Sequence, residues 1–132
     1  MVGDPIELRA LARSYSEGRD ESAPLLVGSA KATLGHSESA AGVAGVLRAL
    51  AVLAAGRTPP APYLNELNRE FRSAAALHVP RAATALPARG GEHRAGVSSF
   101  GMSGVNAHLI LTGSAPCDRR TQDAPGLLTL SA

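Results

Sequence analysis

The N-terminal segment carries a pattern of polar and apolar positions that predicts a helix. Asp4 is able to cap a helix, Pro5 suits the first helical position, and Glu7 is placed to close a capping box. Apolar side chains then recur at helical spacing, at Leu8, Leu11 and Tyr15. The pattern ends near Ser16, and the polar residues 17–23 are predicted to form a loop.

A second, more apolar helix is predicted from about Glu38 to a candidate C-cap at Gly56, with Pro59-Pro60 preventing its continuation. One face of it carries the larger apolar side chains, Val43, Val46, Leu47, Leu50 and Leu53. Its first turns are thin enough for close packing because they contain Ala41, Gly42, Ala44 and Gly45. Because the apolar stretch 40–55 includes Arg48 and many small residues, it is expected to be too short and too polar for a membrane span.

Short apolar runs predict strands at residues 25–27, 77–79, 95–100 and 106–111. The last two runs flank a glycine-bounded turn, Gly101-Met102-Ser103-Gly104, and are predicted to pair as a hairpin or as close neighbours. Residues 60–71 and 81–92 are predicted to be irregular. The chain is therefore expected to be α/β, with a mixed sheet and packed helices. These elements are too few to cover a sheet on both faces, which indicates that part of a larger fold is missing.

Composition excludes several classes of function. The chain has 132 residues and a net charge of +2, and its basic residues are scattered, so neither nucleic-acid binding nor membrane binding is expected. Cys117 is the only cysteine, which excludes an internal disulfide and suits a reducing, cytoplasmic location. The histidines lack metal-ligand spacing, so no metal is expected. The N-terminus does not have the layout of a signal peptide.

The first candidate site is the polar segment that carries Lys31, His36 and Glu38 just before the second helix. A histidine at such a position can stabilise a developing negative charge, and the helix dipole adds a small positive potential. Lys31 can orient a partner or supply charge, while Glu38 can select a tautomer of His36 or pair with Lys31. The alternative interpretation is that His36 is an ordinary loop or cap residue.

The second candidate site is the glycine-bounded turn after Ser98-Ser99-Phe100. Glycines at 101 and 104 would allow backbone N–H groups to point at a ligand, as an oxyanion hole requires, although a hairpin turn with positive φ explains them equally well. Asn106 and His108 face the same side of their strand, which indicates either a hydrogen-bond network or a site. Cys117 lies in a segment without a histidine or a helix start, and is expected to be an inert thiol.

Three blocks of residues together resemble the ketosynthase domains of modular polyketide synthases. The segment Gly28-Ser29-Ala30-Lys31-Ala32-Thr33-Leu34-Gly35-His36-Ser37-Glu38 resembles their lysine–histidine block. The segment Ser98-Ser99-Phe100-Gly101-Met102-Ser103-Gly104-Val105-Asn106-Ala107-His108 resembles their C-terminal glycine loop, and Gly3-Asp4-Pro5-Ile6-Glu7 resembles the segment after their His-Gly-Thr-Gly-Thr motif. The blocks occur in the family's order and at similar distances.

The resemblance implies a partial thiolase-like fold, its C-terminal half, in residues 1–112, followed by the start of a ketosynthase-to-acyltransferase linker in residues 113–132. It implies decarboxylative Claisen condensation of an acyl chain with a malonyl-type extender. The chain would bind no cofactor directly, since the phosphopantetheine of an acyl carrier protein presents the substrates. The expected partners are that carrier protein, the missing N-terminal half or a companion chain, and a second copy in a homodimer.

The resemblance also implies roles for single residues. His36 would be the second catalytic histidine, Lys31 its supporting lysine, and Glu38 the residue that orients them. Met102 would be the gating residue of an oxyanion and substrate-binding loop, which is formed by Phe100, Gly101, Met102, Ser103, Gly104 and Asn106. Thr33 and Val105 depart from the family's usual Asn and Thr.

The family's nucleophilic cysteine and first histidine have no counterpart among these residues. The chain alone is therefore expected to be inactive, to expose apolar surface and to self-associate. An alternative function is a non-catalytic dimerisation or docking module that binds a carrier protein or companion subunit. A serine hydrolase is disfavoured, because no Gly-x-Ser-x-Gly elbow is present.

Overall fold

The computed structural model describes residues 3–15, 17, 19, 23–67, 76–88 and 90–114. Within them the helical segments are α1 (Gly3–Tyr15), α2 (Lys31–Leu34), the 3-10 turn η1 (Glu38–Ala40) and α3 (Ala41–Ala55). The strands are β1 (Leu25–Leu26), β2 (Arg57–Thr58), β3 (Leu77–His78), β4 (Thr84–Ala85), β5 (Glu92–Phe100) and β6 (Asn106–Ser114). The mixed α/β class expected from the sequence is confirmed.

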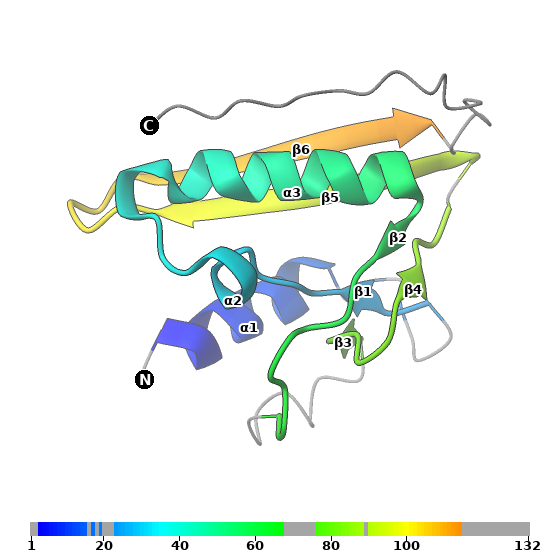
Figure 1. Cartoon of the computed structure of the whole chain (residues 1–132), viewed down its shortest axis with the longest axis horizontal. Helices are drawn as coiled ribbons and strands as arrows, with labels where there is room; N and C mark the ends of the chain where they lie inside the picture. Colours follow the sequence, from blue (N-terminus) through cyan, green and yellow to red (C-terminus); the bar gives the residue numbers. More distant parts are fainter. Residues whose placement is uncertain are drawn as a thin grey trace, which may run out of the picture.

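The largest unit is an antiparallel ribbon of β5 and β6, along which α3 lies (Figure 1). The predicted hairpin is confirmed, and both strands are longer than the sequence pattern indicated. Ser98 lies directly opposite His108, and Phe100 lies opposite Asn106. Because side chains alternate along a strand, these four side chains share one face of the ribbon, while Val97 and Ser99 share the other. The ribbon thus presents one face to α3 and the opposite face to α1.

Glycines allow α3 to approach the ribbon closely, as its thin first turns predicted. A methyl group at Gly45 would lie 2.9 Å from Cγ1 of Val97, and one at Gly42 would lie 3.3 Å from Oγ of Ser99. At the other end of the helix, Leu53 is buried against Gly113, where a methyl group would lie 3.3 Å from Cβ of Leu53. The helix and the ribbon therefore touch along most of their length, and this packing forms part of a small core.

Most of the larger apolar side chains of α3 lie on an exposed face of the helix. Leu53 is 4% exposed, but Val43 and Leu47 are each 62% exposed and Leu50 is 48% exposed. Packing follows the small residues instead, because only they allow the backbones of helix and ribbon to come close. The expected exposure of apolar surface on this helix is confirmed.

The continuous helical stretch Glu38–Ala55 is, by length and composition, able to cross a membrane, with a mean hydropathy of 1.5 over 18 residues. The expectation that the stretch is too short and too polar to span a membrane is therefore wrong in length and in composition, since η1 extends the helical stretch to 18 residues. Such a stretch is weak evidence for a membrane span, since core helices have the same composition. Here one side of α3 packs against β5 and β6.

Two short strand pairs complete the described structure. β1 pairs in parallel with β3, as Leu25 with Leu77, and confirms both predicted strands. β2 pairs antiparallel with β4, as Thr58 with Thr84, within segments that the sequence pattern assigned to a helix end and a loop. Gly56 precedes β2 as the predicted C-cap, with φ 62° and its N–H donating to the carbonyl of Leu53. Neither Arg57-Thr58 nor Thr84-Ala85 belongs to an apolar run like the one that predicted β1, so no local pattern marks this pair.

Other boundaries also differ from expectation. Asp4 is the second residue of α1 rather than the residue before it, and Lys31 begins a one-turn helix that was not predicted. The second strand of the ribbon, β6, ends at Ser114. The expected linker beyond that residue, including Cys117, lies outside the described residues. Among the residues that the structure describes, the buried apolar side chains come from α1, α3 and the segment around β3, and are Leu8, Ala49, Leu53, Ala76, Leu77 and Pro80.

Candidate functional site

The connection from β1 to α3 holds His36 in a defined orientation. Gly35 has φ 78°, which turns the chain after α2, and His36 follows directly. Nδ1 of His36 accepts a hydrogen bond of 3.0 Å from the backbone N–H of Glu38. An amide nitrogen can only donate, so the neutral ring must carry its proton on Nε2. Since residues 31–40 are exposed, this Nε2–H is available to an acceptor outside the described residues.

Glu38 acts on His36 through its main chain rather than through its carboxylate. From the sequence we expected the carboxylate of Glu38 to select the tautomer of His36 or to pair with Lys31. In the described part of the chain, this carboxylate does neither. Glu38 has φ 45°, in the left-handed region that non-glycine residues rarely adopt. The hydrogen bond from the Glu38 N–H holds the ring of His36, so this segment presents the Nε2–H of His36 through main-chain geometry.

In the turn between β5 and β6, the backbone amides of Met102, Ser103 and Val105 make no hydrogen bond with any residue that the structure describes. Gly101 N–H donates to the carbonyl of Val105 at 2.7 Å, and Gly104 N–H donates to the carbonyl of Gly101 at 3.0 Å. Gly104 has φ 88°, which agrees with the hairpin-turn interpretation of this glycine. The amides of Met102 and Ser103 have no partner among the described residues, and Met102 is fully exposed.

The two candidate segments lie at the same end of the molecule. The hairpin turn projects from the end of the ribbon at which η1 and the start of α3 lie (Figure 1). The contact between Gly42 and Ser99 joins α3 to β5 there, two residues before Gly101. The chain that links α2 to α3 thus leads to the end of the ribbon that carries the glycine-bounded turn (Figure 1).

A hydrogen-bond chain that the sequence analysis missed runs across the opposite face of the ribbon. Oγ of Ser98 lies 2.9 Å from Nδ1 of His108, and Nε2 of His108 lies 2.8 Å from the hydroxyl of Tyr15. Of the two alternatives left open for Asn106 and His108, a network is therefore present at His108. The chain ends at a phenol rather than at a carboxylate, so it lacks the third member of a serine-hydrolase triad.

A cavity of about 310 Å³ lies beside this chain, between α1 and the ribbon. Its lining combines polar side chains from both sides with the aromatic rings near the turn. The residues that line it are Glu7, Ala10, Leu11, Ser14, Tyr15, Ser98, Phe100, Asn106, Ala107 and His108. Phe100 and Asn106, both predicted site residues, thus face α1 at the base of the turn. Sequence alternation could have paired Ser98 with His108, but no local signal could have included Tyr15.

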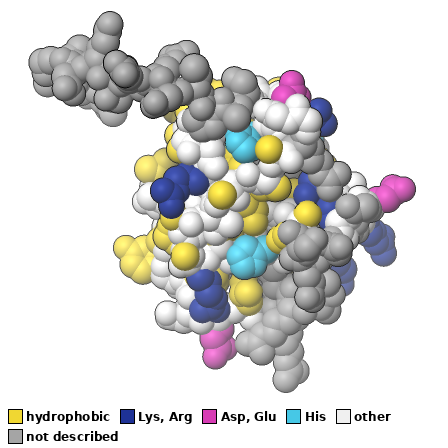
Figure 2. All heavy atoms as spheres, turned by 90° about the vertical axis from the view of Figure 1, so that its right-hand side faces the viewer, with side chains coloured by type: hydrophobic (Ala, Val, Ile, Leu, Met, Phe, Trp, Pro, Cys, Tyr) yellow, Lys and Arg dark blue, Asp and Glu magenta, His cyan; other side chains and the backbone are white. Residues whose placement is uncertain are grey.

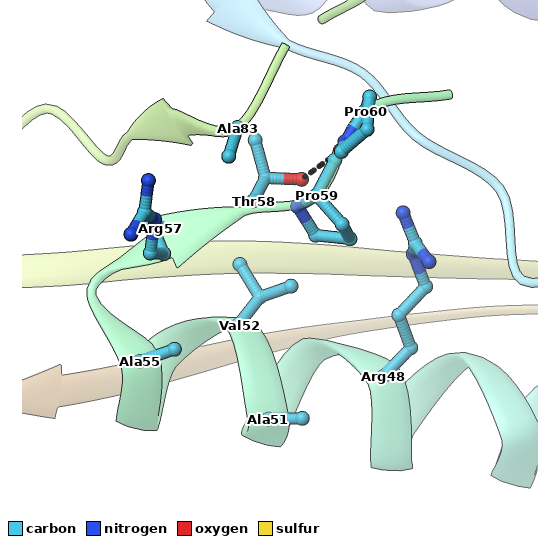
Figure 3. A pocket seen from close by; sticks show the side chains of 9 residues that line it. All are labelled: Arg48, Ala51, Val52, Ala55, Arg57, Thr58, Pro59, Pro60 and Ala83. Carbon is cyan, nitrogen blue, oxygen red and sulfur yellow. Dashed lines mark hydrogen bonds between the residues drawn. The ribbon is translucent and has the colours of Figure 1, made fainter. Parts of the chain in front are cut away.

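A second cavity, of about 390 Å³, lies between the C-terminal half of α3 and the segment from β2 to Pro60 (Figure 3). Arg48 and Arg57 stand on either side of Thr58 and Pro59, above an apolar floor of Ala51, Val52 and Ala55. Neither guanidinium has an ion pair in the described part of the chain. On the face in Figure 2, the described Lys and Arg side chains are dispersed among apolar and polar surface.

Sequence comparison shows that the chain is similar to parts of polyketide synthases. Residues 1–65 match the family described as the C-terminal domain of β-ketoacyl synthase. The chain is 48% identical over 111 residues to a highly reducing polyketide synthase of Emericella nidulans. The matched region covers 83% of this chain and 4% of that protein. It is 42% identical over 118 residues to the erythronolide synthase EryA3 of Saccharopolyspora erythraea. This match covers 89% of the chain and 4% of that protein.

Solved structures with the same fold are ketosynthases. A ketosynthase from module 6 of the bacillaene synthase of Bacillus subtilis superposes with a TM-score of 0.76 at 37% identity, covering 86% of this chain and 22% of that one. Ketosynthase twelve of the bacillaene synthase of Bacillus amyloliquefaciens gives a TM-score of 0.75 at 34% identity, covering 85% and 20%. The partial thiolase-like fold is thereby confirmed, and the chain spans about a fifth of these structures.

Proposed function

Because the chain belongs to the β-ketoacyl synthases, as a C-terminal part of a polyketide synthase ketosynthase, we propose that it supplies part of a site for decarboxylative Claisen condensation. The observation that carries this proposal is the orientation of His36, whose Nε2–H is the free donor because Nδ1 accepts from Glu38. An enolate needs such a donor at its oxygen. The nucleophilic cysteine would come from the remainder of the domain.

In the proposed reaction, the carboxylate of a malonyl-type thioester leaves as carbon dioxide and its bonding electrons form an enolate. Nε2–H of His36 donates to the enolate oxygen, and Lys31 adds positive charge nearby. The enolate carbon attacks the carbonyl of an acyl group held on the cysteine. The carbon–sulfur bond then breaks, and the thiolate leaves with the electron pair.

The glycine-bounded turn is proposed to stabilise the oxyanion formed on the acyl carbonyl. The amides of Met102 and Ser103, at the tip of this turn, have no partner in the part of the chain that the structure describes, which supports an oxyanion role. Phe100 and Asn106 close its base as directly opposite residues and would shape the substrate channel. Gly101 and Gly104 hold the turn through their own hydrogen bonds. Removing one donor of such a site typically lowers kcat about 10²- to 10³-fold.

The partners of the complete enzyme follow from the same proposal. An acyl carrier protein would present both substrates on phosphopantetheine, and the chain itself would bind no cofactor. The complete enzyme would act as a homodimer in the cytoplasm, in the biosynthesis of a secondary metabolite such as an antibiotic. The exposed face of α3, formed by Val43, Leu47 and Leu50, would lie against the rest of the domain.

The decisive experiment compares His36→Ala with a matched control, His78→Ala, in the complete ketosynthase. His78 is also exposed but lies in β3, away from the turn. His36→Ala should lower condensation about 10²- to 10⁴-fold, because a positioned acid or base is lost, and His78→Ala should leave it unchanged. Product formation and carbon dioxide release are measured by mass spectrometry.

A non-catalytic docking module is the second candidate function, and the exposed apolar face of α3 favours it. It would bind a carrier protein or a companion subunit through that face. This function predicts that His36→Ala leaves product formation unchanged, whereas replacing Leu47 by glutamate abolishes association with the partner. Normal condensation by the His36→Ala enzyme would therefore reject the catalytic proposal in favour of the docking module.

A further inference from the structure

The side chain of His108 is held at both ring nitrogens. Ser98 lies 2.9 Å from Nδ1, and Tyr15 lies 2.8 Å from Nε2. The rings of Tyr15 and His108 are also in contact, with centroids 6.3 Å apart and planes tilted by 41°. A hydroxyl can donate or accept, so both bonds persist whichever nitrogen carries the proton. The ring therefore has one preferred orientation in either tautomer.

The ribbon is shaped to receive this ring. Gly96 lies two residues before Ser98 on the same face of β5, and a methyl group there would lie 3.1 Å from Cε1 of His108. This distance is shorter than an ordinary van der Waals contact, so a larger residue at position 96 would crowd the imidazole. The absence of a side chain at Gly96 thus leaves space for the imidazole of His108.

The hydrogen-bond chain lies one register step from the base of the turn. Ser98 and His108 are directly opposite, and the next pair on the same face is Phe100 with Asn106. Beyond that pair the turn is closed by the hydrogen bond from Gly101 to Val105. Any rotation of the end of the ribbon would move the amides of the turn with it.

The same chain is a specific link from α1 to this end of the ribbon. Tyr15 is the last residue of α1, and it reaches His108 across a sequence separation of 93 residues. Beside this link, α1 and the ribbon enclose the cavity of about 310 Å³ rather than packing tightly. Where packing is incomplete, a polar link contributes much of the orientation.

We propose that His108 is a positioning residue, which fixes the base of the glycine-bounded turn against α1 through Tyr15 and Ser98 and so sets the direction of the Met102 and Ser103 amides. This inference rests on the proposed function of that turn. His108 itself would touch neither substrate nor the reacting atoms. Its effect would reach the acyl carbonyl only through the geometry of the amides.

The first test uses amide hydrogen exchange in the chain itself, so it does not depend on catalysis. His108→Ala and Tyr15→Phe should each raise the exchange rates of the Gly101 and Gly104 amides about tenfold, since each variant removes a hydrogen bond that holds the base of the turn. Thr112→Val is the matched control, because Thr112 is an exposed residue on the same face of β6 and its side chain makes no hydrogen bond with the residues that the structure describes. It should leave both rates unchanged.

The second test measures separate steps in the complete ketosynthase. His108→Ala should lower the rate of cysteine acylation about 10²-fold through misplaced donors, while decarboxylation, which depends on His36, stays within about twofold. His108→Gln, which retains a polar group able to reach Tyr15, should restore part of the acylation rate. If His108→Ala fails to fold, Tyr15→Phe gives the same comparison with the loss of a single oxygen.

The outcomes separate this inference from the proposed function. Unchanged exchange rates in both His108→Ala and Tyr15→Phe would overturn the positioning role, whatever the enzyme does. Equal loss of acylation and decarboxylation would also overturn it, because that result indicates general unfolding of the site. If the unmodified complete domain neither acylates nor condenses, the proposed function fails, and the exchange rates alone then decide the role of His108.

Discussion

Replacing Gly45 by alanine tests the closest contact between α3 and the ribbon. The new methyl group would lie 2.9 Å from Cγ1 of Val97, well inside the distance of about 3.5–4.0 Å at which carbon atoms attract. Val97 is β-branched and cannot rotate away easily. Overpacking of this kind costs about 1–3 kcal/mol, whereas the better helix propensity of alanine offsets about 1 kcal/mol. The free energy of unfolding should therefore fall by up to about 2 kcal/mol.

Gly42→Ala is the matched control, because it makes the same chemical change on the same face of α3. Its methyl group would lie 3.3 Å from Oγ of Ser99, a small side chain that can rotate. The gain in helix propensity should then prevail, and the free energy of unfolding should rise by up to about 1 kcal/mol. The two substitutions are thus expected to have opposite signs.

Urea unfolding of the chain, followed by far-ultraviolet circular dichroism at several protein concentrations, measures both effects. Adding Val97→Ala to Gly45→Ala should recover most of the loss, and the double-mutant cycle gives the coupling energy between the two positions. If Gly45→Ala stabilises the chain as much as Gly42→Ala does, the contact with Val97 does not limit packing, and the argument is refuted.

Three further predictions concern the exposed helix face, the helix cap and the cysteine. Leu47→Glu should lower the apparent mass in analytical ultracentrifugation without loss of helix, because Leu47 is an exposed apolar side chain; an unchanged mass would mean that another surface self-associates. Gly56→Ala should destabilise the chain by about 1 kcal/mol in urea unfolding, since φ is 62° there, and equal stability would contradict a left-handed cap. Incubation with an acyl thioester should leave the intact mass unchanged, whereas acylation mapped to Cys117 would show that the chain carries its own nucleophile.

The helices and the hairpin were predictable where the signal is local. The glycine at position 56 ends α3 through its own backbone, and two nine-residue strands around a glycine-bounded turn form a pattern of their own. Residues 57–58 and 84–85 were missed, because they lie outside the apolar runs that predicted the other strands and become strands only through their pairing with each other. The start of α1 was predicted two residues too late, at Pro5 instead of Gly3, because the ends of helices are weakly marked in sequence.

The candidate site was predictable in its members more than in its contacts. His36 and Glu38 are two residues apart, so an interaction between them was expected. The prediction assigned this interaction to the carboxylate of Glu38, whereas the structure shows a hydrogen bond from its backbone N–H. The contact is made by the main chain, and no residue preference signals it. The free amides of the turn likewise follow from its hydrogen bonds rather than from its composition.

Local chemistry therefore explains which segments are helix, strand or turn, and the motifs around His36 and Gly101 explain the family, because both depend on neighbours along the chain. Tertiary structure alone decided which face of α3 is buried, since glycines permit close approach there while larger apolar residues on other faces stay exposed. It also decided that Tyr15 meets His108. A contact between residues so far apart depends on how whole elements pack, and no pattern within either element encodes it.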